Sequence, residues 1–289
     1  MPTLRAATRG SPLARWQAEH VAAQLQAVDP SVEVELVLVD THGDRRLDVP
    51  IWELGGKGVF AKEVQAAVLD GRADLAVHSA KDLPSVVIPG LVIAAVPERG
   101  DPRDALVGST LADLPERAEV ATGSLRRQAE LRRHRPDLRF VTLRGNMQTR
   151  IAKAAEHDAA VVAAVALERL GLWEHIAERL STDVMLPQVA QGALAVECRD
   201  DDAALRALLG RIEHTASRRC VDAERAFLAE LGGDCSLPAG AHAVLDGDQL
   251  HLRAFLASPD GPAMHRFDLR GGDASVGAEV ARHLRAVAG

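Results

Sequence analysis

The sequence of 289 residues lacks tyrosine altogether, and aromatic residues make up only 3% of it. It also lacks any apolar run that approaches the roughly 18 residues needed to cross a membrane. The segment MPTLRAATRGSPLARW contains no apolar stretch of the length found in secretion signals. These absences argue against a membrane or exported protein, and we expect a cytoplasmic one.

Cysteine is scarce, and its placement argues against two kinds of site. The three cysteines, at 198, 220 and 235, are an odd number without C-x-x-C spacing. A disulfide framework and a structural zinc site are therefore disfavoured, and no metal is expected. Cys198 and Cys220 lie in apolar or helical contexts and should be core residues. Cys235 lies in the turn GGDCSLP, where an accessible sulfur suits nucleophilic or attachment chemistry; the alternative is an ordinary loop thiol.

Lysine is rare as well. Only four lysines accompany 30 arginines, and the net charge is −7. An acidic excess across the whole chain speaks against a protein dedicated to nucleic acids or membrane surfaces. Small anions remain as partners, so the placement of the arginines must decide.

The sequence does contain a regular alternation of strand-like and helix-like segments. The strand-like TLRAATR precedes Ser11 and Pro12, a helix N-cap followed by proline at the first helical position. Strand and helix patterns then alternate along most of the chain, which predicts mostly parallel sheets covered on both faces. The predicted fold class is α/β, with a change near Thr215 to a third, α+β domain.

Two stretches predict crossings between domains. One is the turn-rich segment 97–102; the other follows Leu186-Pro187, where the apolar VAQGALAVECR could rejoin the first sheet. The predicted domains are residues 1–98 with 191–212, residues 99–190, and residues 213–289.

Polar and basic residues gather directly after four predicted strands. Ligands of open α/β sheets bind beyond the carboxyl ends of the strands, so these residues are candidates for one site. They are Arg9 and Ser11; His78, Ser79, Lys81 and Asp82; Thr122, Ser124, Arg126 and Arg127; and Arg144, Gly145, Asn146 and Arg150. Guanidinium groups, hydroxyls and helix N-termini suit carboxylates or phosphates, which predicts a multiply anionic small-molecule ligand. For Arg126 and Arg127 the alternative is a solvated helix face.

One acid stands among these basic residues. Asp82, in HSAKDLPS, is a candidate general acid or stabiliser of positive charge. The alternative is a turn or cap residue. Lys57, in ELGGKGVF, lies in a glycine-rich segment without P-loop spacing, which predicts a closing lid or, alternatively, an ordinary solvent loop.

Eight segments, in order, resemble the porphobilinogen deaminase (hydroxymethylbilane synthase) family. They are ATRGSPLARWQ, GGKGVFAKE, RADLAVHSAKDLP, DPRDALV, SLRRQ, LRGNMQTR, QGALAVECR and ERAFLAELGGDCSLPAG. The resemblance implies a transferase of tetrapyrrole (haem) biosynthesis that joins four porphobilinogen units head to tail, releases ammonia each time and yields 1-hydroxymethylbilane. It also implies two domains like those of type 2 periplasmic binding proteins around a central cleft, and a third domain that carries the cofactor. The implied partner is the small-molecule substrate, with neither nucleic acid nor membrane, and a monomer is expected.

The resemblance also implies residue roles. Asp82 matches the family's catalytic aspartate, and Cys235 matches the cysteine that holds a dipyrromethane cofactor through a thioether. Each pyrrole bears an acetate and a propionate, which need cationic partners. The implied cofactor contacts are Lys81, Thr122, Ser124, Arg126, Arg127, Arg144 and Gly145; the implied substrate contacts are Arg9, Ser11, Ser79, Arg150, Arg169 and Gln191; and Lys57 belongs to the lid.

The sequence departs from the family pattern at four positions. Gly123 replaces a usual serine, Glu53 occupies an often basic position, and His42 stands where arginine is common. Asp234 precedes the cysteine where a small residue is usual, and its carboxylate should disfavour the thiolate. The alternatives are a divergent paralogue with a different pyrrole product, a non-catalytic anion-binding protein of the same two-lobed fold, and a cysteine-dependent hydrolase, for which no partner histidine is visible.

Overall fold

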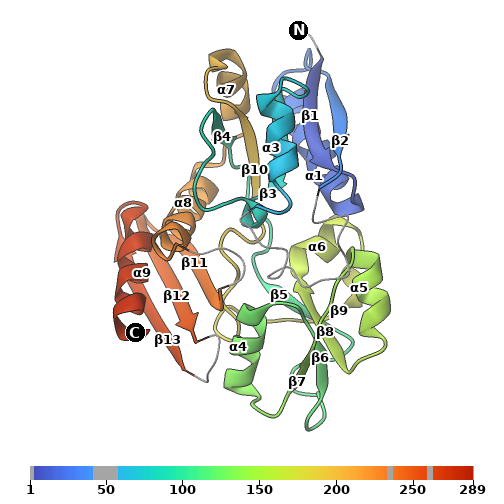
Figure 1. The fold of residues 1–289 in the computed structure, drawn as a ribbon, viewed down its shortest axis with the longest axis vertical. Helices are drawn as coiled ribbons and strands as arrows, with labels where there is room; N and C mark the ends of the chain where they lie inside the picture. The colour runs from blue at the N-terminus through green and yellow to red at the C-terminus, as the bar shows by residue number, and fades with distance from the viewer. Residues whose placement is uncertain (1–2, 42–57, 233–236, 259–262, 289) are drawn as a thin grey trace.

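The structure is a computed structural model that describes residues 3–41, 58–232, 237–258 and 263–288. Figure 1 shows three parts, each built around its own sheet. Five residues discussed above lie outside the described residues: His42, Glu53, Lys57, Asp234 and Cys235.

The first sheet has the strand order β2-β1-β3-β10-β4, and β10 runs antiparallel to both of its neighbours. Its strands are β1 (Leu4–Arg9), β2 (Val34–Val39), β3 (Leu75–Ser79), β4 (Leu91–Ala95) and β10 (Leu194–Arg199). The helices that pack on it are α1 (Pro12–Val28), α3 (Lys62–Leu69) and α7 (Ala203–Gly210), and the 3-10 helix η2 (Ala80–Asp82) follows β3.

The second sheet has the order β7-β6-β8-β5-β9, and β5 runs antiparallel to both of its neighbours. Its strands are β5 (Asp104–Val107), β6 (Glu119–Ala121), β7 (Arg139–Val141), β8 (Ala159–Ala163) and β9 (Ile176–Arg179). Its helices are α4 (Leu125–His134), α5 (Met147–Ala154), α6 (Ala164–Arg169) and the 3-10 helix η3 (Trp173–His175).

These two sheets share one topology. In each, three parallel strands are followed by an antiparallel strand that comes directly after a crossing between the domains: β5 after the first crossing and β10 after the second. The segment ALAVECR thus lies in the first sheet, between β3 and β4. The predicted fold class, two α/β domains of one kind and a third α+β domain, is confirmed.

The third sheet is an antiparallel meander, β11-β12-β13. Its strands are β11 (Ala239–Asp246), β12 (Gln249–Ala257) and β13 (Met264–Gly271), and its helices are α8 (Thr215–Glu230) and α9 (Ser275–Ala288). The two helices approach closely at Gly277, where a Cβ atom would lie 1.9 Å from the carbonyl oxygen of Ala223. Only glycine permits this contact, so any larger residue would push α9 away from α8.

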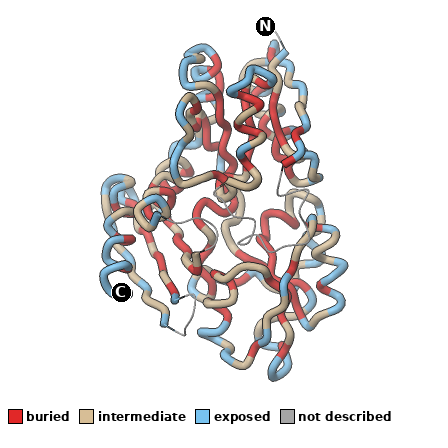
Figure 2. Tube along the Cα trace, in the orientation of Figure 1, coloured by how far each residue is buried: buried red, intermediate tan, exposed pale blue. Residues whose placement is uncertain are grey.

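The third domain packs on both crossing segments. The buried carboxylate of Glu224 in α8 accepts hydrogen bonds from both terminal nitrogens of Arg99 at 2.7 and 3.1 Å. It also accepts from the backbone N–H groups of Ala190 at 2.6 Å and Ala243 at 2.9 Å. One carboxylate therefore ties the first crossing, the second crossing and β11 together. Figure 2 shows that the central strands and the inner faces of the helices form the buried interior of each part.

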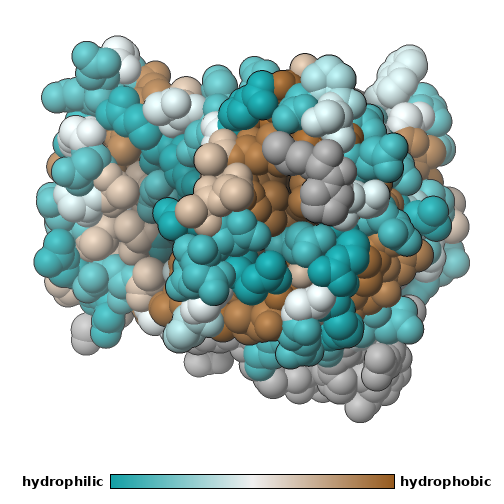
Figure 3. All heavy atoms as spheres, turned by 90° about the horizontal axis from the view of Figure 1, so that it is seen from above, coloured by the Kyte–Doolittle hydropathy of each residue, from teal (hydrophilic) through white to brown (hydrophobic). Residues whose placement is uncertain are grey.

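The predictions for the start of the first helix and for two of the cysteines are confirmed. Ser11 caps α1, because its side chain accepts from the N–H of Ala14, and Pro12 is at the first helical position. Cys198 and Cys220 are buried. No helix within the described ranges is long and apolar enough to span a bilayer. In Figure 3, hydrophilic side chains cover much of the face seen from above.

Candidate active site

A cleft of about 800 Å³ is lined by residues from both α/β sheets. It contains many of the predicted site residues: Arg9, Ser11, Ser79, Lys81, Asp82, Ser124, Arg127, Arg144, Gly145 and Arg150. They lie at the ends of β1 and β3, in the segments that follow β1, β3, β6 and β7, or in the first turns of α4 and α5. The carboxyl ends of parallel strands in two sheets thus meet at one cavity, as the strand-end argument predicts.

Three helix N-termini reach this cleft. Their N-cap residues, Ser11, Ser124 and Asn146, all line it. Asn146 accepts a hydrogen bond from the N–H of Thr149 at 2.9 Å. Gly145 just before it has φ +116, and a Cβ atom there would lie 2.7 Å from the Thr149 side chain. The positive ends of α1, α4 and α5 add to the attraction for carboxylates.

The charge of the cleft is strongly positive. Its described lining contains two carboxylates, Asp40 and Asp82, and six basic side chains, Arg9, Lys81, Arg127, Arg144, Arg150 and Lys153. Burial lowers the pKa of Lys81 to about 8. Burial, with the neighbouring charges of Arg127 and Arg144, lowers the pKa of Arg150 to about 10. Like charges held this close favour a ligand with several negative charges.

Asp82 is the half-buried carboxylate of this cleft. It ends η2, directly after β3, and its charge opposes the lowering of the pKa of both Lys81 and Arg150. Asp82 lines the cleft and is not the N-cap residue of η2, which is Ser79. Its position thus agrees better with a role in the cleft than with a purely local turn or cap.

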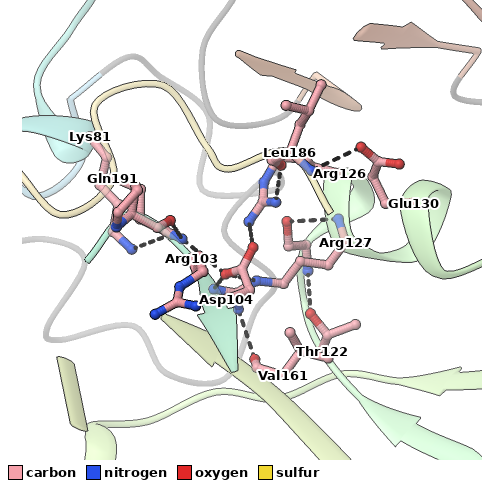
Figure 4. Close-up of polar contacts among 12 residues, drawn as sticks. Lys81, Arg103, Asp104, Thr122, Arg126, Arg127, Glu130, Val161, Leu186 and Gln191 are labelled. Atoms are coloured by element: carbon pink, nitrogen blue, oxygen red, sulfur yellow. Dashed lines mark hydrogen bonds and ion pairs between the residues drawn. The ribbon is translucent and has the colours of Figure 1, made fainter. Parts of the chain in front are cut away.

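Arg126 and Arg127 enclose a buried carboxylate, that of Asp104 (Figure 4). Arg126 Nη2 lies 2.7 Å from Asp104 Oδ2, and Arg127 Nη2 lies 2.7 Å from Oδ1. Arg126 Nη1 donates to the carbonyl oxygen of Leu186, and Arg127 Nη1 donates to that of Val161. With 3% and 8% of their surfaces exposed, the two arginines do not form a solvated helix face, and that alternative is wrong. Arg127 lines the cleft, whereas Arg126 lies behind its wall.

Asp104 is ionised in this setting. Burial by itself would raise the pKa of the carboxyl, but the guanidinium groups of Arg126 and Arg127 outweigh burial and hold the pKa at about 2. Asp104 was missing from the sequence-based candidates. The sequence feature that could have indicated Asp104 is an acidic residue at the start of the apolar strand in DPRDALV.

Gln191 extends this cluster to the first domain. Lys81 Nζ donates to Gln191 Oε1 at 3.2 Å, and Gln191 Nε2 donates to Asp104 Oδ1 at 3.1 Å. Gln191 also donates to the carbonyl oxygen of Pro102 at 2.8 Å. It is fully buried and does not line the cleft. It therefore joins the two domains behind the cleft wall.

Thr122 and Arg169 also lie away from the main cleft lining. Thr122 is buried and its hydroxyl accepts from the N–H of Ser124 at 3.3 Å. Arg169 Nη2 donates to the carbonyl oxygen of Gly192 at 2.7 Å, and its guanidinium lies 5.4 Å from the ring centre of Trp16. Burial lowers the pKa of Arg169 to about 10. In this structure Arg169 therefore links α6 to α1 and to the second crossing.

Comparisons with known proteins agree with this geometry. The family model described as porphobilinogen deaminase, dipyromethane cofactor binding domain, matches residues 4–207, and that of the porphobilinogen deaminase C-terminal domain matches residues 218–286. The chain belongs to the porphobilinogen deaminase family. A porphobilinogen deaminase of Syntrophomonas wolfei is 49% identical over 266 residues, which cover 90% of this chain and 87% of that protein. One of Syntrophotalea carbinolica is 48% identical over 266 residues, covering 90% of this chain and 84% of that protein.

Solved structures with a related arrangement are more distant. A nutrient binding protein from Burkholderia cenocepacia bound to methionine is 14% identical, with a TM-score of 0.43 over 71% of this chain and 89% of that one. The effector binding domain of BenM with benzoate is also 14% identical, with a TM-score of 0.42 over 73% of this chain and 90% of that one. Similarity at this level supports no statement about the ligand of this chain.

The cleft fits the cofactor of the porphobilinogen deaminase family. A dipyrromethane with an acetate and a propionate on each ring carries four carboxylates. The described lining has an excess of four positive charges. Side chains of the lining that would hold these carboxylates are Lys81, Ser124, Arg127 and Arg144. The matching attachment residue, Cys235, lies outside the described residues.

Two further side chains of the cleft were not among the predicted site residues, and a third, His78, is paired with a buried acid. Lys153 lines the cleft three residues after Arg150 on α5, a helical spacing that could have indicated it. Gln17 of α1 lines the cleft and donates to Ser79 Oγ at 2.8 Å. His78 lines the cleft and lies with its Nε2 atom 3.1 Å from Glu197 Oε2, both side chains being buried.

The departure at Gly123 lies in the cleft lining. A Cβ atom at this position would lie 3.4 Å from the carbonyl oxygen of Leu143, an ordinary contact. The family's usual serine would therefore fit here, and the glycine removes a hydroxyl from the anion site. Within the described part of the chain, no group of three or more His, Cys, Asp or Glu residues could hold a metal ion.

Proposed function

We propose that this protein is a porphobilinogen deaminase, a transferase of tetrapyrrole biosynthesis that joins four porphobilinogen units into 1-hydroxymethylbilane. The observation that carries the proposal is a cleft of about 800 Å³ with six basic side chains around the half-buried carboxylate of Asp82. Membership of the porphobilinogen deaminase family supports it. The proposal includes a cytoplasmic location and a monomeric state.

The basic side chains bind carboxylates. We assign four residues to binding of the incoming substrate: Arg9, Ser11, Ser79 and Arg150. We assign five residues to binding of the cofactor: Lys81, Ser124, Arg127, Arg144 and Gly145. The remaining predicted contacts, Thr122, Arg126, Arg169 and Gln191, hold the walls of the cleft through the hydrogen bonds described above. Carboxylates paired with these side chains relieve the repulsion among the cations, so substrate binding and the stability of the cleft support each other.

Asp82 acts on the reacting substrate. The C–N bond of the aminomethyl group breaks, its electron pair leaves with nitrogen as ammonia, and positive charge develops on the pyrrole. A fixed carboxylate stabilises that charge, and it does so more strongly in a half-buried cleft than in water.

The cofactor, when bound, supplies an anchored acceptor for the first substrate unit. We propose Cys235 as its thioether attachment point and Lys57 as part of a lid over the cleft. Asp234, beside the proposed attachment residue, adds negative charge next to the sulfur and should slow attachment.

Stoichiometric turnover tests the proposed function. Purified protein incubated with porphobilinogen is expected to release four molecules of ammonia for each linear tetrapyrrole formed. A Cys235→Ala variant should release neither ammonia nor a linear tetrapyrrole. Binding of porphobilinogen without ammonia release would instead indicate a non-catalytic anion-binding protein, and ammonia release with another pyrrole product would indicate a divergent paralogue.

A further inference from the structure

Asp40 is the second carboxylate of the cleft, and the chemistry above gives it no role. It directly follows β2, is exposed and lines the cleft, which places it at the rim. It forms no ion pair with any other described residue. Apart from Asp40 and Asp82, the described charged lining is basic.

The sheet register places Asp40 beside the anion-binding end of β1. Strands β1 and β2 are parallel, and Arg9 is paired with Val39. Asp40 is therefore one residue beyond that pair, next to Gly10. Neighbouring strands lie about 4.8 Å apart, so the backbones of Arg9 and Asp40 lie at adjacent strand ends. Both residues line the cleft, so its rim contains a cation and an anion from adjacent strand ends.

Porphobilinogen carries the complementary pair of charges. Its aminomethyl group, an ammonium at neutral pH, and its acetate are on adjacent ring carbons. A cleft with an excess of positive charge attracts the carboxylates of this substrate but repels its ammonium. A carboxylate at the rim offsets that repulsion at the point of entry.

We propose that Asp40 binds the aminomethyl ammonium of incoming porphobilinogen while Arg9 binds a carboxylate of the same molecule. This role rests on the proposed function and sharpens it. Asp40 selects and orients a zwitterionic pyrrole at the rim, whereas Asp82, half-buried in η2, faces the C–N bond that breaks. Asp40 therefore acts on capture of the substrate and not on the chemical step.

The experiment compares Asp40→Asn, which keeps the size of the side chain and removes its charge, with the wild-type holoenzyme. We expect the KM for porphobilinogen to rise about fivefold, the value of one partly screened ion pair, with kcat unchanged. Glu35→Gln is the matched control, because Glu35 is an exposed acid on β2, the strand that Asp40 follows, and does not line the cleft. This control should leave KM unchanged.

A porphobilinogen analogue with methyl in place of aminomethyl separates charge recognition from a general effect on the cleft. Its inhibition constant should be the same for the wild type and Asp40→Asn. An unchanged KM for porphobilinogen, a lower KM, or equal weakening of the analogue would each overturn the proposal. Calorimetry compares the affinity of the wild type and of Asp40→Asn for porphobilinogen without relying on turnover. A wild type that binds porphobilinogen but releases no ammonia would refute the proposed function. The difference in affinity between the two proteins would still test the role of Asp40.

Discussion

Replacement of Asp82 by asparagine is expected to lower kcat for porphobilinogen by about 10³-fold, the loss typical when a charge that faces the transition state is removed. The amide keeps the shape of the side chain but cannot balance the positive charge that develops as ammonia leaves. KM should change little, because the basic side chains that bind the substrate carboxylates remain. Steady-state ammonia release measures both constants.

An exposed aspartate on the same domain provides the control. Asp70, at the C-terminal end of α3, forms an exposed ion pair with Arg72 and does not line the cleft. Its asparagine variant should retain wild-type kcat. If Asp82→Asn kept most of its activity while folding normally by circular dichroism, Asp82 would lose its catalytic assignment and the cleft would need another source of charge stabilisation.

Replacement of Asp104 by alanine should have the largest effect on stability. The substitution leaves the guanidinium groups of Arg126 and Arg127 buried without their shared counter-ion, and Gln191 loses an acceptor. Breaking a buried pair in this way costs about 3–5 kcal/mol of unfolding free energy. Urea denaturation should show this loss as a lower midpoint. The control, Asp246→Ala, removes an exposed partner of Arg270 and should leave the midpoint unchanged.

The same carboxylate predicts a dependence of stability on pH. The pKa of Asp104 in the folded protein is about 2, below its ordinary value of 3.8. Its contribution is therefore complete above about pH 4 and is lost as the pH falls toward 2. In Asp104→Asn the loss of stability between pH 4 and 2 should be smaller than in the wild type. Equal pH dependence of the two proteins would show that Asp104 is not the titrating group.

The alternation of strands and helices predicted much of the fold, because periodicity along the chain reports which face of each element is buried. Ser11 and Pro12, for example, define the start of α1 by local chemistry alone. The strand-end rule likewise gathered Arg9, Lys81, Arg127 and Arg150 at one cleft. These features depend on residues close together in the sequence or on a general property of parallel sheets.

The environment of the arginine pair was not predictable in the same way. Arg126 and Arg127 are paired with Asp104, 22 and 23 residues earlier in the chain, across strands β5 and β6, which are not neighbours in the sheet. Only the antiparallel insertion of β5 brings this acid beneath α4. Gln191 enters the cluster from the second crossing, so its role depends on how two domains meet. Long-range pairing of this kind leaves no local signal in the sequence.

The intact mass of the purified protein tests the central claim, a pyrrole cofactor held covalently in a basic cleft, most directly. We expect a mass above that of the 289-residue polypeptide by one dipyrromethane, no such excess in Cys235→Ala, and further increments of one pyrrole unit after addition of porphobilinogen. A bare polypeptide mass that does not change on incubation with porphobilinogen would contradict it.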